Sequence, residues 1–296
     1  MICRCLFIAL LVCLPLPLAA QTAEIVDRDA SVRGFKLHYR EAGRGAPVVL
    51  LHGLGGDGSR WAQNIAPLAA DFRVIALDQI GFGQSDKPMA NYHTGMLSEF
   101  LVDFLDVIGI PKASLVGNSM GAFVAAYTAV RRPDLVDRLV LVNGAGYKRR
   151  AGAPPLDPHR TQIQNGVTRQ ELREFFRMLV HDKSLVTNTM VEDNLALRLR
   201  SAFAIARMQE SIELGRGGIT DDEMRSIKAP TLIVWGKYDE WLGPPERLGE
   251  RLHRDINGSQ LVVIDDAGHL PQLEKPREFN EIVQRFLQAA SRDRQK

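Results

Sequence analysis

The sequence predicts an α/β protein with a mostly parallel sheet, helices on both faces and an inserted helical segment. Apolar runs rich in β-forming residues alternate with helix-like segments through the first half of the chain. Residues 144–226 then show helical periodicity without a strand-like run, and this stretch is too long for a simple crossover. We therefore expect an eight-stranded sheet built from residues 21–143 and 227–296, with residues 144–226 forming a helical cap.

The first half of the chain alternates regularly. Residues 24–43 have the period-two pattern of a hairpin, and the all-apolar runs 47–51 and 73–77 are typical of strands buried on both faces. The remaining elements expected before the insertion are helices over 59–70 and 94–108, a strand over 113–116, a helix from 120 and a strand over 138–142.

Two helical stripes are predicted inside the insertion. The first covers 168–180 and contains Leu172, Phe175, Phe176, Leu179 and Val180. The second covers 188–213 and contains Leu195, Leu199, Ala202, Phe203 and Ala206. Strands over 230–235 and 260–264 and a helix over 276–290 complete the predicted fold.

Charge and composition exclude some classes of partner. The 296 residues carry a net charge of only +2, and no basic stripe is interleaved with aromatic residues. The most basic run, 148–150, is typical of a solvated loop. We therefore expect no nucleic acid partner.

The first twenty residues have the pattern of a signal peptide. Arg4 supplies a positive charge, residues 6–14 are apolar, and small residues precede an expected cleavage site after Ala20. The apolar run is too short to span a bilayer comfortably, so we expect no membrane anchor after cleavage. The predicted location is periplasmic or extracellular.

The three cysteines, Cys3, Cys5 and Cys13, all lie in this leader. The mature chain would then have no disulfide, no thiol nucleophile and no cysteine-based metal site. We expect neither a metal nor a cofactor.

The segment 117–121, Gly-Asn-Ser-Met-Gly, carries the chemistry. An apolar strand precedes it and a small-residue helix follows it, so Ser119 stands at the apex of a strand–turn–helix. This is the context of a nucleophile elbow, in which the strained serine backbone requires small neighbours.

A serine nucleophile needs a base and an acid to orient that base. Asp239 and His269 each follow a late strand, and the order Ser119, Asp239, His269 is the one that accompanies a nucleophile elbow. Asp265 and Asp266 compete with Asp239 as the acid, but they lie too close to His269 in sequence to reach its far nitrogen easily.

With these placements the mature chain resembles the α/β-hydrolase-fold enzymes over nearly its whole length. The motifs that carry the resemblance are 52–56, 78–86, 117–121, 236–239 and 268–269. The resemblance implies that the cap is a lid over the site. It also implies an oxyanion hole made by the backbone N–H groups of Leu54 and Met120, and Met120 opens a helix whose first amides favour negative charge.

Four further residues are candidates for substrate binding. Asn118 lies beside the nucleophile, and Phe123, Trp241 and Leu270 lie near the predicted catalytic residues in sequence. Each of the last three either lines the acyl pocket or fills the core. The residues around 78–86 are most simply a structural turn beside the site.

These residues favour a serine-dependent carboxylic ester hydrolase that forms an acyl-enzyme on a small-molecule acyl ester. Ser119 would attack, His269 would relay the proton, Asp239 would orient His269, and water would release the acid. A serine at the elbow disfavours the dehalogenases and epoxide hydrolases of this fold, because they attack with a carboxylate.

Other activities share the same residues. The Asn118–Met120 sequence resembles that of C–C bond hydrolases acting on ring-cleavage products, although Leu270 stands where that group usually has an aromatic residue, and a signal peptide is unexpected there. A cofactor-free perhydrolase or acyltransferase would use every predicted catalytic residue. A ligand-binding protein would keep the pocket without fast turnover.

Overall fold

The computed structural model describes residues 24–144, 146–149, 152–154 and 157–293, so the predicted signal peptide lies outside the described residues. The predicted α/β class with an eight-stranded, mostly parallel sheet is confirmed, with strand order β1-β2-β4-β3-β5-β6-β7-β8. The strands are β1 (Val26–Val32), β2 (Phe35–Ala42), β3 (Ala46–Leu51), β4 (Phe72–Leu77), β5 (Ala113–Asn118), β6 (Val136–Val142), β7 (Thr231–Gly236) and β8 (Gln260–Ile264).

The sheet reverses its order at β3. Strand β3 pairs in parallel with both β4 and β5, so the chain builds outward first on one side and then on the other. Only the pairs β1–β2 and β2–β4 are antiparallel. In open α/β sheets, ligands bind beyond the carboxyl ends of the strands at such a reversal, which is the region just after Leu51 and Asn118.

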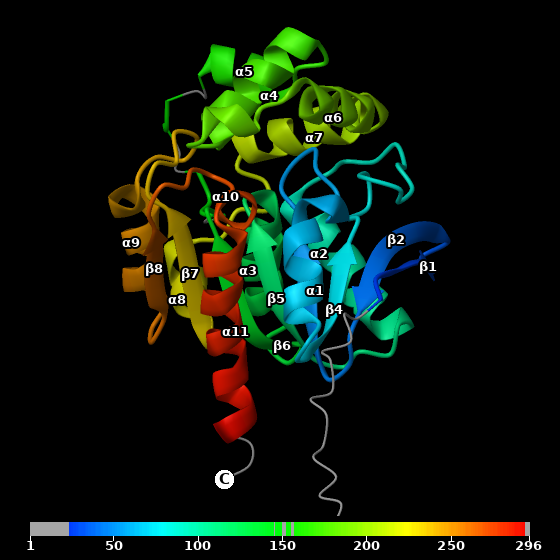
Figure 1. Ribbon diagram of the computed structural model, residues 1–296, viewed down its shortest axis with the longest axis vertical. Coiled ribbons are helices and arrows are strands. Elements are labelled where there is room, and N and C mark those ends of the chain that lie inside the picture. The colour runs from blue at the N-terminus through cyan, green and yellow to red at the C-terminus, as the bar shows by residue number, and fades with distance from the viewer. Residues whose placement is uncertain (1–23, 145, 150–151, 155–156, 294–296) are drawn as a thin grey trace, which may run out of the picture.

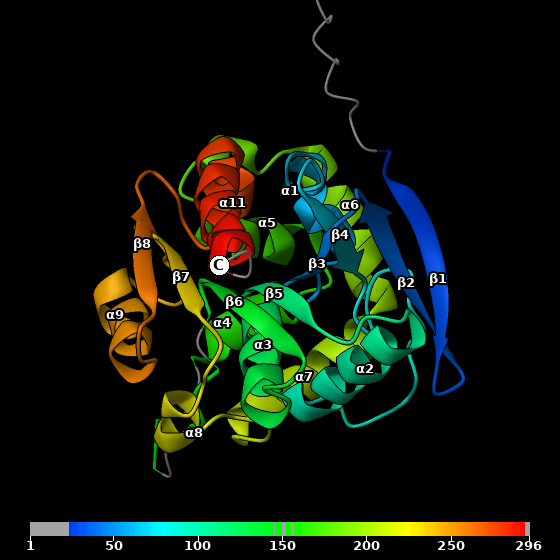
Figure 2. The ribbon, with the colours of Figure 1, turned by 90° about the horizontal axis from the view of Figure 1, so that it is seen from below.

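Helices cover both faces of the sheet (Figure 2). Helices α1 (Ala62–Leu68) and α11 (Pro276–Asp293) contact each other on one face, and α2 (Thr94–Val107) packs beside α3 (Met120–Arg131) on the other. No described helix has the length and apolar character needed to span a membrane. The remaining α-helices are α8 (Asp221–Arg225), α9 (Pro245–Asp255) and α10 (Pro271–Glu274). Helix α8 belongs in sequence to the predicted cap, but it contacts α3 and α9.

The side chains of β3 point alternately to the two faces of the sheet, and helices cover both faces. Val49 and Leu51 point into the core cluster that contains α2 and α3, whereas Val48 and Leu50 point into the cluster that contains α1 and α11. All four side chains are fully buried. A strand buried on both faces is therefore apolar at every position, as predicted from the sequence.

Four helices lie together beyond one end of the strands (Figure 1): α4 (Pro158–Gln164), α5 (Arg169–Leu179), α6 (Asn188–Arg200) and α7 (Ala202–Glu213). They lie between β6 and β7 in sequence, within the predicted cap; its exact boundaries stay a prediction. The predicted stripe on 168–180 is buried, as expected, and forms the core of the cap.

The predicted stripe on 188–213 is wrong. The segment is two helices that meet at Ser201, and Leu199 in the predicted stripe is 54% exposed. The inward face of α6 contains Val191 together with two polar residues, Asn194 and Arg198. Helical periodicity located the helices but selected the wrong face, because it assumes that buried residues are apolar.

Candidate active site

Ser119 occupies the strained turn that its motif predicts. Its backbone has φ 54° and ψ −117°, a conformation that residues with side chains rarely adopt. Strand β5 ends directly before it, α3 begins directly after it, and its N–H donates to the Val142 carbonyl at 2.9 Å.

The small neighbours of Ser119 allow the strand and the helix to cross closely. A Cβ atom at Gly117 would lie 2.3 Å from the Gly121 carbonyl, and one at Gly121 would lie 2.1 Å from the Leu51 carbonyl oxygen. Both distances are far below any real van der Waals contact, so each position requires glycine. The spacing of the motif is a packing requirement.

His269 and Asp239 meet beside this turn. His269 follows β8, Asp239 follows β7, and the His269 Nδ1 lies 2.8 Å from the Asp239 Oδ2. Both side chains are buried. Ser119 and His269 line the same cavity, and the Ser119 hydroxyl has no hydrogen-bond partner among the described residues. Catalytic hydrogen bonds are often long before substrate binds, so the missing serine contact does not exclude His269 as the base, and the role of the three residues as a triad stays a prediction.

Asp239 is fixed by four hydrogen-bond donors. Its Oδ1 accepts from the backbone N–H groups of Trp241 and Leu242, each at 2.8 Å, and its Oδ2 accepts from His269 and from the Asn143 amide at 2.7 Å. Burial alone would raise the pKa of this carboxyl, but the charge of His269 and these donors outweigh burial and lower the pKa. Asp239 is therefore held as a carboxylate.

The competing carboxylates lie elsewhere. Asp265 pairs with Lys237 at 2.6 Å and Asp266 with Lys275 at 3.6 Å, and all four side chains are at least partly exposed. Neither carboxylate is hydrogen-bonded to His269. The structure thus gives the orienting contact to Asp239.

Asn143 was not predicted, although it follows a buried strand directly. It is fully buried with φ 42°, and its amide oxygen accepts from the Gly236 N–H at 3.0 Å while its nitrogen donates to Asp239. It therefore joins the ends of β6 and β7 and sets the position of the acid. A polar residue at the carboxyl end of a central strand was the available signal.

The glycine loop after β3 lies next to the elbow. His52 is fully buried, with its Nδ1 2.8 Å from the Gly53 carbonyl and its Nε2 accepting from the Gln79 N–H at 3.1 Å. It therefore shapes the loop and is not free to transfer protons at the site. Met120 is the first residue of α3, so its N–H has no acceptor within the helix. Leu54 and Ser119 line the same cavity, which is consistent with the predicted oxyanion hole.

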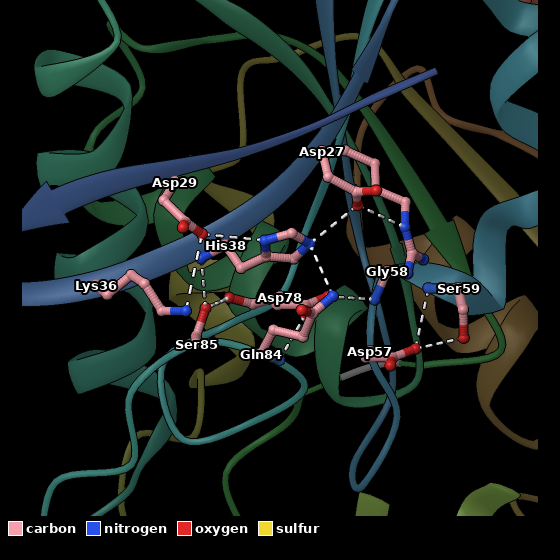
Figure 3. A network of polar contacts seen from close by, with 11 residues as sticks. Asp27, Asp29, Lys36, His38, Asp57, Gly58, Ser59, Asp78, Gln84 and Ser85 are labelled. Carbon is pink, nitrogen blue, oxygen red and sulfur yellow. Dashed lines mark hydrogen bonds and ion pairs between the residues drawn. The ribbon is translucent and has the colours of Figure 1, made fainter. Parts of the chain in front are cut away.

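The turn after β4 is hydrogen-bonded to β2 and to the residues that follow this loop, as Figure 3 shows. The buried Asp78 carboxylate accepts from the N–H groups of Gly58 and Gln84, both at 2.7 Å. The Ser85 hydroxyl donates to the Asp78 carbonyl at 2.5 Å and accepts from the His38 N–H at 2.8 Å. The 78–86 segment is thus a structural turn that ties β2, β4 and the glycine loop together.

The space around Ser119 has two compartments that share Leu54, Ser119, Gln164 and Trp241. The smaller compartment is lined by Arg60, Asn118, Phe175, Phe176, His269 and Leu270. The larger one is lined by Phe123, Arg149, Arg160, Gln209, Ile212 and Leu248. Ser119 stands where the two compartments meet.

The four candidate substrate-binding residues all line this space. Phe123 faces the larger compartment, Asn118 and Leu270 face the smaller one, and Trp241 borders both. The Asn118 amide nitrogen is already engaged, since it donates to the Val142 carbonyl at 3.2 Å and the His269 carbonyl at 3.1 Å. It therefore positions the loop that carries the predicted base.

Glu274 was also missed by the sequence analysis. Its Oε1 accepts from the Gly268 N–H at 2.6 Å, and its Oε2 accepts from the N–H groups of His181 and Asp182 at 2.6 and 3.0 Å. Burial raises the pKa of this carboxyl although the three donors oppose the shift. Because the His269 N–H also donates to the Leu179 carbonyl at 2.7 Å, the cap is tied directly to the histidine loop.

The described residues contain no cluster of three or more His, Cys, Asp or Glu side chains suited to a metal ion. The described side chains that meet here are the Ser119 hydroxyl, the His269 imidazole and, behind it, the Asp239 carboxylate. Together they can carry out nucleophilic acyl transfer.

A family model described as alpha/beta hydrolase fold matches residues 46–202 and 184–276. The chain therefore belongs to the α/β-hydrolase family, and it is a hydrolase of this fold.

Particular relatives narrow the comparison. The chain is 34% identical, over 86% of its length and 92% of the relative's, to a 2-hydroxy-6-oxononadienedioate/2-hydroxy-6-oxononatrienedioate hydrolase of Pseudomonas putida. It is similar to the structure of a meta-cleavage product hydrolase from Pseudomonas fluorescens, with TM-score 0.79 and 27% identity over 89% of this chain and 98% of that one. A membrane phospholipase A, described as a bacterial virulence factor, gives TM-score 0.76 and 26% identity over 90% and 86%.

We predict that Asp239→Asn lowers kcat by about 10⁴-fold, the size of loss known for a triad acid converted to its amide. An amide nitrogen in place of Oδ2 would face two other donors, His269 and Asn143. Asp265→Asn is the matched control, because this exposed carboxylate contacts Lys237 alone among the described ion pairs. Equal losses of kcat in the two variants would contradict the assignment.

The assignment of Asp239 as an ionised acid also predicts how the free energy of unfolding depends on pH. The pKa of Asp239 is lower in the folded protein than its ordinary value of 3.8. The carboxylate therefore contributes stability above about pH 4, and this contribution is lost as the pH falls through the folded-state pKa. In urea unfolding between pH 2.5 and 7, the deficit of Asp239→Asn should be largest above pH 4 and should shrink below it. A deficit that grows on acidification would contradict this assignment of the ionised acid.

Proposed function

We propose that this protein is a serine-dependent C–C bond hydrolase acting on a ring-cleavage product, a dienol that carries a ketone and a carboxylate. The observation that carries the proposal is the similarity to a 2-hydroxy-6-oxononadienedioate hydrolase over most of both chains. This similarity supports C–C bond hydrolysis over the ester hydrolysis that the sequence alone favoured.

In the proposed reaction, the Ser119 hydroxyl attacks the ketone carbon while His269 accepts its proton. The negative charge that forms on the ketone oxygen is stabilised by the N–H groups of Leu54 and Met120, each worth about 3 kcal/mol in the transition state. The bond to the neighbouring carbon then breaks. This step requires the keto tautomer of the dienol, in which the enol proton has moved to that neighbouring carbon. The electrons of the broken bond then delocalise into a dienolate, whose oxygen takes the proton from His269, and an acyl group stays on Ser119.

Water completes the cycle. His269 removes a proton from the water molecule that attacks the acyl carbon, and it returns that proton to Ser119 as the acid is released. Asp239 holds the imidazole in one tautomer through the 2.8 Å contact with Nδ1. The two compartments that meet at Ser119 give room for a substrate on both sides of the bond that breaks.

A second candidate function is carboxylic ester hydrolysis, which uses the same residues. The similarity to a membrane phospholipase A favours it, and so do the apolar side chains Phe123, Ile212 and Leu248 in the mixed wall of the larger compartment. An ester differs in that its leaving group is an alcohol, which His269 would protonate. Perhydrolysis and acyl transfer also stay predictions from the shared catalytic residues.

The experiment compares two substrates with the purified mature chain. We expect cleavage of a 2-hydroxy-6-oxo-dienoate, which is monitored by the loss of its visible absorbance. The kcat/KM value should be at least about a hundredfold above that for 4-nitrophenyl butyrate. We expect this difference because a site that fits the dienol stabilises the carbanion leaving group in the transition state, and 4-nitrophenyl butyrate does not use that fit. Faster turnover of the ester, with no loss of dienoate absorbance, would reject C–C hydrolysis and favour the esterase.

We further propose that the protein is exported, on the basis of the leader-like pattern in residues 1–20. The protein recovered from the periplasm of an expressing Gram-negative cell should begin at Gln21, as measured by intact mass. A cytoplasmic protein that retains residues 1–20 would contradict export.

A further inference from the structure

Arg198 is a buried cation that forms no ion pair with any described carboxylate. The inward face of α6 carries it into the cap interface, where its side chain is 1% exposed. Its Nε and Nη2 have no hydrogen-bond partner among the described residues. Burial lowers the pKa of its guanidinium to about 10, with the neighbouring positive charge of Arg60 acting in the same direction. The group is still protonated at neutral pH, and an unpaired buried charge is costly.

Arg60 brings a second positive charge to the same place, from the opposite side of the interface. Burial also lowers the pKa of Arg60, and Asp57 is the one carboxylate whose charge opposes that shift. Asp57 accepts instead from the Ser59 N–H at 2.9 Å. Arg60 donates from Nη2 to the neutral Asn194 side chain. Neither arginine is therefore neutralised by a described ion pair.

The two guanidinium groups lie beside the wall of the smaller compartment. Arg60 lines that compartment directly. The Cζ of Arg60 lies 5.0 Å from the ring centre of Phe176, and the Cζ of Arg198 lies 5.0 Å from that of Phe175. Both rings line the compartment, so the aromatic faces hold the guanidinium planes in place.

The glycine loop makes room for both side chains. A Cβ atom at Gly55 would lie 2.5 Å from the Arg198 Nη1, and one at Gly56 would lie 3.2 Å from the Arg60 Cγ. Gly55 also has φ +72°, which favours glycine by itself. The loop that carries the Leu54 amide is thus packed against both arginines. The positive charges lie close to the place where the substrate's carbonyl would bind.

We infer that the smaller compartment is a carboxylate subsite, in which Arg60 binds a carboxylate of the substrate and Arg198 adds a second positive charge behind it. A guanidinium fork matches the two oxygens of a carboxylate, and charge-assisted hydrogen bonds of this kind are the strong ones. The inference rests on the proposed function, because it takes this compartment as part of the substrate site. It adds the place and the residues: the carboxylate of the substrate lies on the side of Ser119 that Arg60 occupies, and Arg60 determines the preference for an anionic substrate.

The binding experiment is independent of which bond the enzyme breaks. Glutarate is titrated by calorimetry into Ser119→Ala, and into the same protein carrying Arg60→Gln or Arg198→Met. Loss of one charge-assisted bond should weaken the Kd for glutarate about tenfold to a hundredfold. Arg200→Gln is the matched control, because Arg200 lies on the same helix but is exposed, and it should leave the Kd within twofold.

The outcomes separate clearly. Neutral glutaramide should bind at least tenfold more weakly than glutarate, and inorganic phosphate should bind more weakly than glutarate. An unchanged glutarate Kd in Arg60→Gln, equal binding of glutaramide, or tighter binding of phosphate would each overturn the carboxylate subsite. Arg198→Met should also keep or raise the thermal midpoint, because replacing an unpaired buried charge by an apolar side chain removes its desolvation cost. A large fall in the midpoint would mean that Arg198 has a structural role instead.

Kinetics supply the second readout. The two substrates are the 4-nitrophenyl monoesters of glutaric and pentanoic acid, which differ in a carboxylate against a methyl group. The ratio of their kcat/KM values should fall at least tenfold in Arg60→Gln, mainly through KM, and Arg60→Lys should restore part of it. A ratio that stays constant would overturn the inference.

Failure of this inference is distinguishable from failure of the proposed function. Dienoate cleavage that Arg60→Gln leaves unchanged would reject the subsite and leave C–C hydrolysis standing. Glutarate binding that depends on Arg60, without any dienoate cleavage, would keep the subsite and reject C–C hydrolysis.

Discussion

The backbone of Ser119 is the constraint on which the site depends. Its φ of 54° is held only because β5 and α3 are fixed on either side, and because Gly117 and Gly121 let helix and sheet approach to contact distance. Strain of this kind persists where the surrounding structure over-determines it. The packing of the core on both faces of the sheet thus has a chemical consequence, because it holds Ser119 at the wall of the cavity.

The histidine loop is held from three directions. Asn118, at the end of β5, donates to the His269 carbonyl, and the Leu179 carbonyl in the cap accepts from the His269 N–H. Glu274 accepts from the N–H groups of Gly268 in the histidine loop and His181 in the cap. A movement of the cap therefore cannot leave the base unaffected. The same contacts place the imidazole against Asp239, whose own position Asn143 sets. Substrate fit and proton transfer are coupled through these bonds.

The sequence predicts what local rules govern. The elbow, the strand ends that carry Asp239 and His269, and the doubly apolar strands all follow from short-range patterns. The inward face of α6 could not be predicted, because it buries Asn194 and Arg198 while Leu199 stays exposed. The burial of Arg198 depends on residues outside α6, namely Arg60 across the interface and the aromatic residues of the cap. The periodicity of a single helix does not contain that information.

The central claim is that Ser119 is a nucleophile activated by His269. The most direct measurement is reaction of the purified protein with a fluorophosphonate, followed by mass spectrometry of the peptides. We predict one adduct, on Ser119, formed at least about a hundredfold more slowly in His269→Ala because the base is missing. An adduct on another residue, or a labelling rate that His269→Ala leaves unchanged, would contradict it.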